Sequence, residues 1–230
     1  MQRRDLVRTG LIGAAAAAAG AAQAASPEKK RLTEDWDVVV VGAGFAGMCA
    51  ALEAAEKGAK TVLIEKMNRP DGATVYSSGW IAAVGSRFQK NHPEDSKKAF
   101  FDDMMRLSHY RSDPELIKVY AEESGDGIDW LADHGTPFYL WENLPSPELS
   151  RCLISPGEGI TGGSKLIRCL MAALEKKGVP IHYNTKAVSL VKDDCFNVEG
   201  VSCITPEGRK DYLARGGVIL TTGGYGANEA

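Results

Sequence analysis

The sequence lacks every paired-cysteine motif. Its five cysteines form no C-x-x-C pair, no haem-attachment C-x-x-C-H and no zinc-binding spacing. Histidine is also scarce, with four residues in the chain. We therefore predict no metal site, and we expect the histidines to be surface or structural residues; they are His92, His109, His134 and His182.

An excess of positive charge is missing as well. The chain has 230 residues, with 27 Lys and Arg against 30 Asp and Glu, which gives a formal net charge of −3. This balance argues against a nucleic-acid partner and favours small-molecule chemistry. The hydrophobic share of 44% and the charged share of 25% are ordinary for a globular protein.

No apolar stretch is suited to a stable membrane span. The longest one lies near the N-terminus and is short and rich in alanine. It follows Arg3 and Arg4 and ends in the small-residue pattern Ala22-Gln23-Ala24. Paired arginines, a mild apolar region and such a cleavage site are typical of a twin-arginine export signal. We predict a removable signal over residues 1–25, a periplasmic mature protein, and a loose polar linker over residues 26–35.

A βαβ unit is predicted after the linker. Val38 to Val41 form a continuous β-branched run that ends in glycine, which is typical of a fully buried parallel strand. Residues 48–57 have helical composition and stop at Gly58, and residues 61–64 form the next apolar run. The connection has the length that a βαβ unit requires.

The rest of the chain mixes helices with short strands. Helices are expected near 94–109, 114–133 and 165–177, a short helix within 71–86, and an aperiodic surface excursion over 135–162. The helix at 114–133 carries an apolar stripe, interrupted at two glycines; the residues are Leu116, Ile117, Tyr120, Ile128 and Leu131, with Gly125 and Gly127. Short antiparallel strands are expected at 180–183, 187–192, 197–204 and 209–214, before a buried strand at 218–222.

This order predicts an α/β fold of the Rossmann type. A parallel sheet, a helical excursion over 92–161 and a β-meander would together form one domain over residues 36–230.

A glycine-rich turn joins the first strand to its helix. Gly42 permits a sharp turn, Gly44 leaves room for a pyrophosphate, and Gly47 allows close packing of helix on sheet. Glu65 ends the second strand, where a carboxylate accepts both ribose hydroxyls and repels a 2′-phosphate. The pattern predicts dinucleotide binding, and a tight structural turn is the alternative. The later return of a strand with a glycine end, Val218–Gly224, favours FAD over NAD.

Several segments recur in the order and spacing of one family. They are Val39–Gly47, Ile64-Glu65-Lys66, Gly72–Gly85, Asp113–Gly135, Gly162–Lys177 and Ile219–Asn228. On these segments the chain resembles the N-terminal half of the fumarate reductase/succinate dehydrogenase flavoprotein family, in its flavocytochrome c and urocanate reductase branch. The resemblance covers Asp37 to Ala230.

The resemblance implies FAD as cofactor and assigns its contacts. Ala46 and Gly47 would face the pyrophosphate, and Glu65 the adenosine ribose. The remaining assignments are Thr74, Ser78 and Gly79 along the pyrophosphate and flavin ring, Val188 at the adenine, and Thr222, Gly223 and Gly224 closing over the dinucleotide. The chain departs from the family in having Asp71-Gly72-Ala73-Thr74 where Gly-Gly-Asn-Thr is common, and Gly79-Trp80 where a glycine pair is common.

The resemblance also implies a reaction. Family members transfer hydride between FAD and an activated C=C bond of a small unsaturated acid, such as fumarate or urocanate, and a ketosteroid-type dehydrogenase is an alternative. Electrons would come from a separate protein such as a cytochrome. The family's substrate-gripping clamp domain would follow Ala230, so we predict a fragment with no catalytic residue of its own and no turnover alone. A non-catalytic flavin-binding remnant and a split enzyme stay as alternatives, and Arg111 and Arg151 are expected to be solvated.

Overall fold

The computed structural model describes residues 32–90, 95–141, 151–157 and 160–224. The described domain begins at Leu32 and forms one compact unit. The predicted export signal therefore lies outside the described residues. Within the described ranges, no helix is long and apolar enough to cross a membrane.

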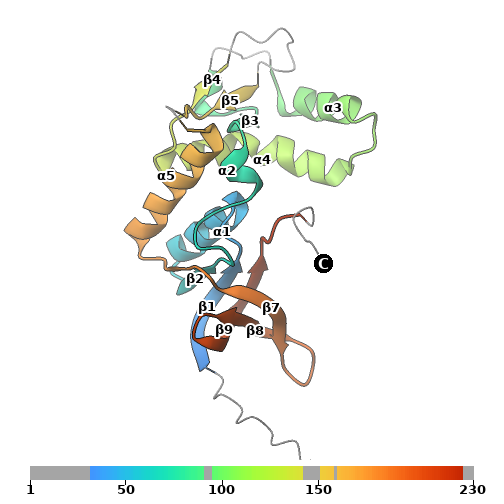
Figure 1. The fold of residues 1–230 in the computed structure, drawn as a ribbon. Helices are drawn as coiled ribbons and strands as arrows, with labels where there is room; N and C mark the ends of the chain where they lie inside the picture. The colour runs from blue at the N-terminus through green and yellow to red at the C-terminus, as the bar shows by residue number, and fades with distance from the viewer. Residues whose placement is uncertain (1–31, 91–94, 142–150, 158–159, 225–230) are drawn as a thin grey trace, which may run out of the picture. The chain divides into compact units, whose positions relative to one another are not determined.

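A six-stranded sheet organises the domain (Figure 1). Its strands, in spatial order, are β6 (Ile181–His182), β2 (Thr61–Ile64), β1 (Leu32–Val41), β9 (Gly208–Leu220), β8 (Val198–Thr205) and β7 (Lys186–Lys192). The first four strands run parallel, and β9, β8 and β7 form an antiparallel meander. The predicted Rossmann-type sheet is confirmed, with the meander continuing the same sheet.

Both faces of β1 are buried. Val40 faces a core shared with helices α1 (Phe45–Glu56) and α5 (Gly162–Lys177). Val39 and Val41 face a second core on the other side of the sheet, together with Trp36 and Tyr212. Burial on both faces explains why the strand is a continuous apolar run rather than an alternating one.

Sequence-local signals fix the ends of α5. The Thr161 hydroxyl accepts a hydrogen bond from the Ser164 amide at 3.1 Å, so it caps the first turn. Gly178 ends the helix in a left-handed conformation with φ of 71°. Leu170 and Leu174 are fully buried on the side that meets the sheet core. The amphipathic pattern at 165–177 therefore predicted this helix correctly, apart from its first turn.

The segment between β2 and α5 contains further helices and a second sheet. The helices are α2 (Ala73–Tyr76), the 3-10 turn η1 (Arg87–Gln89), α3 (Lys97–Leu107) and α4 (Pro114–Asp133). The sheet has the antiparallel order β3-β5-β4, with bounds Trp80–Ala82, Cys152–Ile154 and Tyr139–Leu140. The excursion over 135–162 was expected to be aperiodic, but it contains the strands β4 and β5. The sequence pattern did not reveal them because they are too short to show a periodicity.

Three expectations about strands also need correction. The linker prediction ran to residue 35, but β1 begins at Leu32 and pairs with β9 from there. The predicted strands at 209–214 and 218–222 are one continuous strand, β9, that pairs with β1 on one side and β8 on the other. The short strand near residue 181 is parallel to β2, not antiparallel. In each case a distant pairing partner, not the local pattern, decides the structure.

Helix α4 is continuous through both of its glycines. A Cβ on Gly125 would lie 2.8 Å from the Gly85 carbonyl carbon, so this glycine permits close packing and does not break the helix. The predicted apolar stripe holds only in the second half, where Ile128 and Leu131 are buried. Leu116 and Tyr120, in the first half, are exposed.

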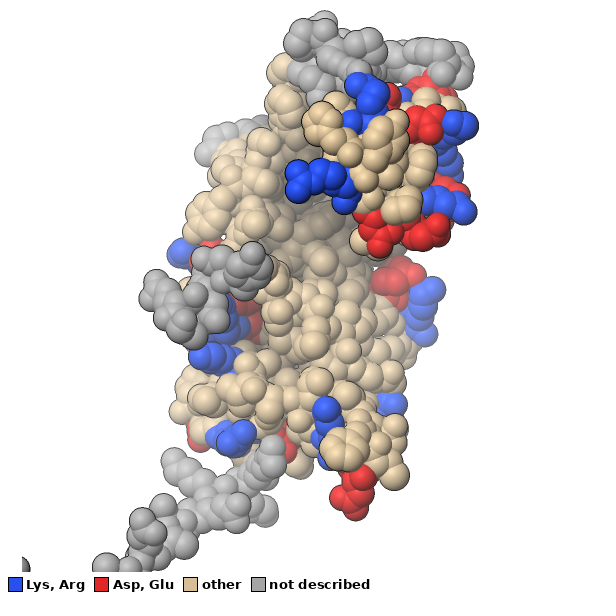
Figure 2. Space-filling model, turned by 90° about the vertical axis from the view of Figure 1, so that its right-hand side faces the viewer, with Lys and Arg blue, Asp and Glu red and all other residues tan. Residues whose placement is uncertain are grey.

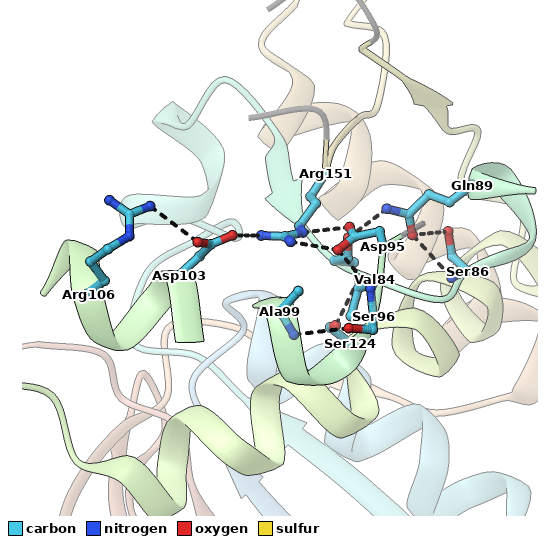
Figure 3. Close-up of polar contacts among 11 residues, drawn as sticks. Val84, Ser86, Gln89, Asp95, Ser96, Ala99, Asp103, Arg106, Ser124 and Arg151 are labelled. Atoms are coloured by element: carbon cyan, nitrogen blue, oxygen red, sulfur yellow. Dashed lines mark hydrogen bonds and ion pairs between the residues drawn. The ribbon is translucent and has the colours of Figure 1, made fainter. Parts of the chain in front are cut away.

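Arg151 is buried, which contradicts the expectation that it is solvated. Its guanidinium donates two hydrogen bonds of 2.6 Å to Asp95 and one of 2.7 Å to Asp103 (Figure 3). Asp103 in turn bonds to Arg106 at 3.2 Å. Because Arg151 directly precedes β5, this network ties α3 to the small sheet.

Candidate dinucleotide-binding site

The turn between β1 and α1 is held together by two glycines that the fold requires. Gly42 has φ of 107°, and a Cβ on it would lie 2.5 Å from the Thr221 carbonyl oxygen. A Cβ on Gly47 would overlap the Gly42 carbonyl oxygen and lie 2.6 Å from the Thr221 hydroxyl. These contacts bring the start of α1 against the ends of β1 and β9. The predicted packing role of Gly47 is supported by this geometry.

Gly44 is different, because nothing in the fold requires it. It caps α1 with φ of −80°, which any residue can adopt, and a Cβ on it would meet no atom within 4 Å. No side chain caps this helix. The first amides of α1, at Phe45, Ala46 and Gly47, therefore have no intrahelical acceptor. Ala46 is exposed beside the open space at Gly44, whereas Gly47 is buried. A helix N-terminus with free amides and no obstructing Cβ favours a phosphate group.

Glu65 is fixed beside this turn. It is buried, and its carboxylate accepts one hydrogen bond from the Ala43 amide at 2.8 Å and another from the Met67 amide at 2.9 Å. Each carboxylate oxygen has a further lone pair for a ribose hydroxyl. The backbone bonds hold the side chain in one orientation before any ligand arrives.

Thr221 is a site residue that the sequence did not reveal. Its amide donates to the Val41 carbonyl at 2.9 Å, and its hydroxyl lies 2.8 Å from that oxygen and 3.0 Å from the Gly42 carbonyl oxygen. It thus locks the end of β9 to the glycine turn. A hydroxyl residue at the end of an apolar run was the only signal, and it did not distinguish Thr221 from Thr222.

The residues after Thr221 lie where the prediction placed them, at the end of β9. Thr222, Gly223 and Gly224 are exposed, and Gly223 has φ of 76°. Their proximity to the turn makes them available to a dinucleotide lying across Gly44. Their contact with a cofactor stays a prediction.

The predicted flavin-side loop packs on the start of α5. A Cβ on Gly79, which has φ of 78°, would lie 2.6 Å from the Gly162 Cα. A Cβ on Gly163 would overlap the Thr74 carbonyl oxygen, and the Gly163 amide donates to the Ser77 carbonyl at 3.1 Å. Ser78 is exposed beside Gly79. The loop is therefore held in place through backbone contacts with two glycines of α5.

Val188 lies on the edge strand β7, at a register shift between Ala187 and Ser189. The strand begins beside the ribose residue, because the Thr185 amide donates to the Glu65 carbonyl at 2.8 Å. Val188 is 41% exposed, and its contact with the adenine stays a prediction.

A weakly charged surface occupies the side of the domain on which α3 and the end of β9 lie. In the space-filling view, charged side chains gather on the helices at the top and near the lower edge (Figure 2). The hollowed surface between them is almost free of charge (Figure 2). The exposed apolar residues of the domain include Leu107 of α3 and Leu116 and Val119 of α4.

His182, Cys49 and Cys203 have structural surroundings, whereas His109 and Cys195 are exposed and His92 lies outside the described residues. His182 contacts the Tyr212 hydroxyl at 2.9 Å, and burial lowers the pKa of His182. Burial raises the pKa of Cys49 and of Cys203 to about 12, so neither thiol is an activated nucleophile. All five cysteines are free. In the described ranges, no cluster of His, Cys, Asp and Glu could hold a metal ion.

His134 is held by acceptors at both ring nitrogens. Nδ1 lies 2.6 Å from the Trp130 carbonyl oxygen, and Nε2 lies 3.0 Å from a Glu56 carboxylate oxygen. Only the doubly protonated ring can donate to both. Burial lowers the pKa of His134, but the two hydrogen bonds raise it by more than burial lowers it, so the net pKa is above 6.5.

We expect Glu56→Gln to lower the pKa of His134 in an NMR titration and to leave that of His182 unchanged. Because the folded pKa is raised, the ion pair stabilises the fold fully below pH 6.5, and this contribution is lost as pH rises through the folded value. Glu56→Gln should therefore cost more stability at about pH 6 than at about pH 9. Identical His134 titrations in the two proteins would contradict this assignment.

A sequence profile of the family described as "FAD binding domain" matches residues 37–230. The chain is 37% identical over 202 residues to the urocanate reductase of Eggerthella lenta, covering 86% of this chain and 33% of that protein. It is 31% identical over 193 residues to a fumarate reductase (cytochrome) of Shewanella frigidimarina, and this match covers 84% of this chain and 34% of that protein. The chain thus spans about a third of the length of these relatives.

Solved structures with the same arrangement include two enzymes. A flavocytochrome c3 fumarate reductase in its open conformation has a TM-score of 0.75 and 33% identity, over 85% of this chain and 35% of that one. A 3-ketosteroid-Δ4-(5α)-dehydrogenase from Rhodococcus jostii has a TM-score of 0.76 and 29% identity, over 86% and 48%. The fold of this chain therefore also occurs in a flavocytochrome fumarate reductase and in a ketosteroid dehydrogenase.

Proposed function

Because the chain belongs to the FAD-binding domain family of oxidoreductases, we propose that it forms the FAD-binding part of an exported reductase acting on small unsaturated acids. The observation that carries the proposal is Gly44. The fold does not need a glycine there, but a pyrophosphate at the uncapped start of α1 does. The reductases of urocanate and fumarate among its relatives support the substrate class.

The residues present fit FAD. The free amides of Ala46 and Gly47 would hold the pyrophosphate, and Glu65 the adenosine ribose. On the flavin side, Thr74, Ser78 and Gly79 would offer backbone and hydroxyl groups. Val188 would meet the adenine, and Thr222, Gly223 and Gly224 would close over the dinucleotide.

Bound FAD supplies the hydride chemistry of such an enzyme. The contribution of this chain is to bind and orient the cofactor, through a turn that Thr221 and Glu65 hold rigid. We propose that the groups that grip the substrate and donate the proton lie outside these 230 residues. From the predicted export signal, we also propose that the protein is periplasmic.

Two other functions are open to the same site. A steroid-type oxidoreductase is favoured by the likeness to the ketosteroid dehydrogenase structure. A flavin-binding protein without turnover is favoured by the absence, in the described part of the chain, of an assigned catalytic residue.

FAD binding tests the part of the proposal that these residues carry, and lack of FAD binding contradicts all three functions. For anaerobic reoxidation, the chain is loaded with FAD, reduced with dithionite, and mixed in turn with fumarate, urocanate and 4-androstene-3,17-dione. Because we propose that the groups that grip the substrate lie outside this chain, we expect FAD binding without reoxidation by either acid, a result that the third function shares. Reoxidation by the steroid alone supports the second function, and reoxidation by the acids would contradict the proposed placement of the substrate-gripping groups.

A further inference from the structure

A groove runs along α5 on the side away from the sheet core. It consists of two adjoining cavities of about 300 and 410 Å³. His134, Gly135 and Ala172 line both of them, so α5 forms one wall and the end of α4 the other. The groove lies outside the predicted dinucleotide site, and none of the site residues lines it.

Unpaired cations line the α5 wall of this groove. Lys165, Arg168 and Lys176 are spaced by three and eight residues, which places them on one face of the helix. In the part of the chain that the structure describes, none of the three has an ion-pair partner. Glu175 is the one acidic residue among the exposed positions of α5.

The acidic residues at the far end of the groove are already paired. Glu56 bonds to His134 at 3.0 Å and contacts Lys177 at 3.7 Å. Asp133 bonds to Arg87 at 2.6 Å. Among the described residues that line the groove, the net charge is therefore positive, although the whole chain has a formal net charge of −3.

The groove also starts close to the predicted flavin ring. Gly162, the first residue of α5, packs directly on Gly79, a predicted flavin contact. With a rise of 1.5 Å per residue, the basic face begins about 5 Å along the helix at Lys165 and ends about 20 Å along it at Lys176. A protein docked on this face would hold its own redox group near the flavin.

We propose that this basic groove docks the acidic face of the protein that donates electrons to the flavin. The inference rests on the proposed function, because only a bound flavin needs a donor. Reduction of one FAD takes two electrons and two protons, so two molecules of a one-electron donor would each be oxidised once, with protons supplied by water. Charge complementarity would speed the encounter and make it dependent on salt.

The first test is binding and needs no FAD. An acidic flavodoxin labelled with a fluorophore serves as the probe, and its anisotropy is followed as the chain is added. We expect binding at about 20 mM salt that weakens strongly at about 200 mM, where screening is shorter-ranged. The triple variant K165E/R168E/K176E should weaken binding about tenfold or more.

The matched control reverses three exposed lysines away from the groove, in the variant K90E/K118E/K192E. It has the same net charge as the groove variant and should bind nearly as the unaltered chain does. Equal weakening in both variants, or no binding by the unaltered chain at low salt, would overturn the docking site.

The second test is electron transfer to the FAD-loaded chain. Reduced flavodoxin should reduce the flavin about tenfold more slowly in the groove variant, whereas dithionite should reduce both proteins at the same rate. Weaker docking with an unchanged rate of reduction would overturn the role as a donor site. A chain that binds no FAD would contradict the proposed function, while the binding test would still decide whether the groove docks an acidic protein.

Discussion

Gly47→Ala is expected to lower the free energy of unfolding by about 3 kcal/mol or more. The added Cβ would overlap the Gly42 carbonyl oxygen and lie 2.6 Å from the Thr221 hydroxyl. Neither group can move freely, because Gly42 lies in the turn and the Thr221 hydroxyl is bonded to the Val41 carbonyl. Helix α1 would have to shift away from the sheet, which opens the core behind it. Urea unfolding followed by circular dichroism measures the change.

Gly44→Ala is the matched control, three residues earlier in the same turn. Its Cβ would meet no atom within 4 Å. The loss should be at most about 1 kcal/mol, which is the range of substitutions at a helix cap. Equal losses for the two variants would show that the turn is not packed as described.

Arg151→Ala is expected to lower the free energy of unfolding by about 3–5 kcal/mol, which is the range for removing one partner of a buried ion pair. Arg151 is 6% exposed, and its removal leaves the carboxylates of Asp95 and Asp103 without their shared cation. The contact between α3 and the small sheet would be lost with it. Thermal or urea unfolding of the variant measures this loss of stability. The control is Arg111→Ala, which changes an exposed arginine and should have little effect on stability.

The pH dependence provides a second readout for this network. The hydrogen bond from Arg151 holds the pKa of Asp103 below its usual value of 3.8. A lowered folded pKa means that the stabilisation is present above pH 3.8 and is lost as pH falls through the folded value. The difference in the free energy of unfolding between the unaltered chain and Arg151→Ala should therefore become smaller as the pH falls through this acidic range. A constant difference would contradict the ion-pair explanation.

Much of the sheet core could be predicted because its signals are local. The valine run and its glycine end define β1, and the cap Asp113 with Pro114 defines the start of α4. The glycines of the turn indicated the site for the same reason, since each has a distinct steric role that is visible in the spacing.

Features that depend on distant partners could not be predicted. Strands β4 and β5 have two and three residues, and they are strands only because β5 pairs with β3 on one side and with β4 on the other. The burial of Arg151 depends on two carboxylates more than 45 residues away in sequence. The first half of the α4 stripe is the reverse case, because Leu116 and Tyr120 are exposed although the apolar pattern predicted their burial.

The turn that contains Gly44 is proposed to bind the pyrophosphate of FAD. Titration of the chain with FAD, followed by flavin fluorescence, is the decisive measurement, with Gly44→Ala as the comparison. We expect the unaltered chain to bind FAD and the variant to bind about tenfold or more weakly, with the two proteins equally folded. Equal affinities, or a folded chain that binds no FAD, would contradict the assignment of this turn as the pyrophosphate site.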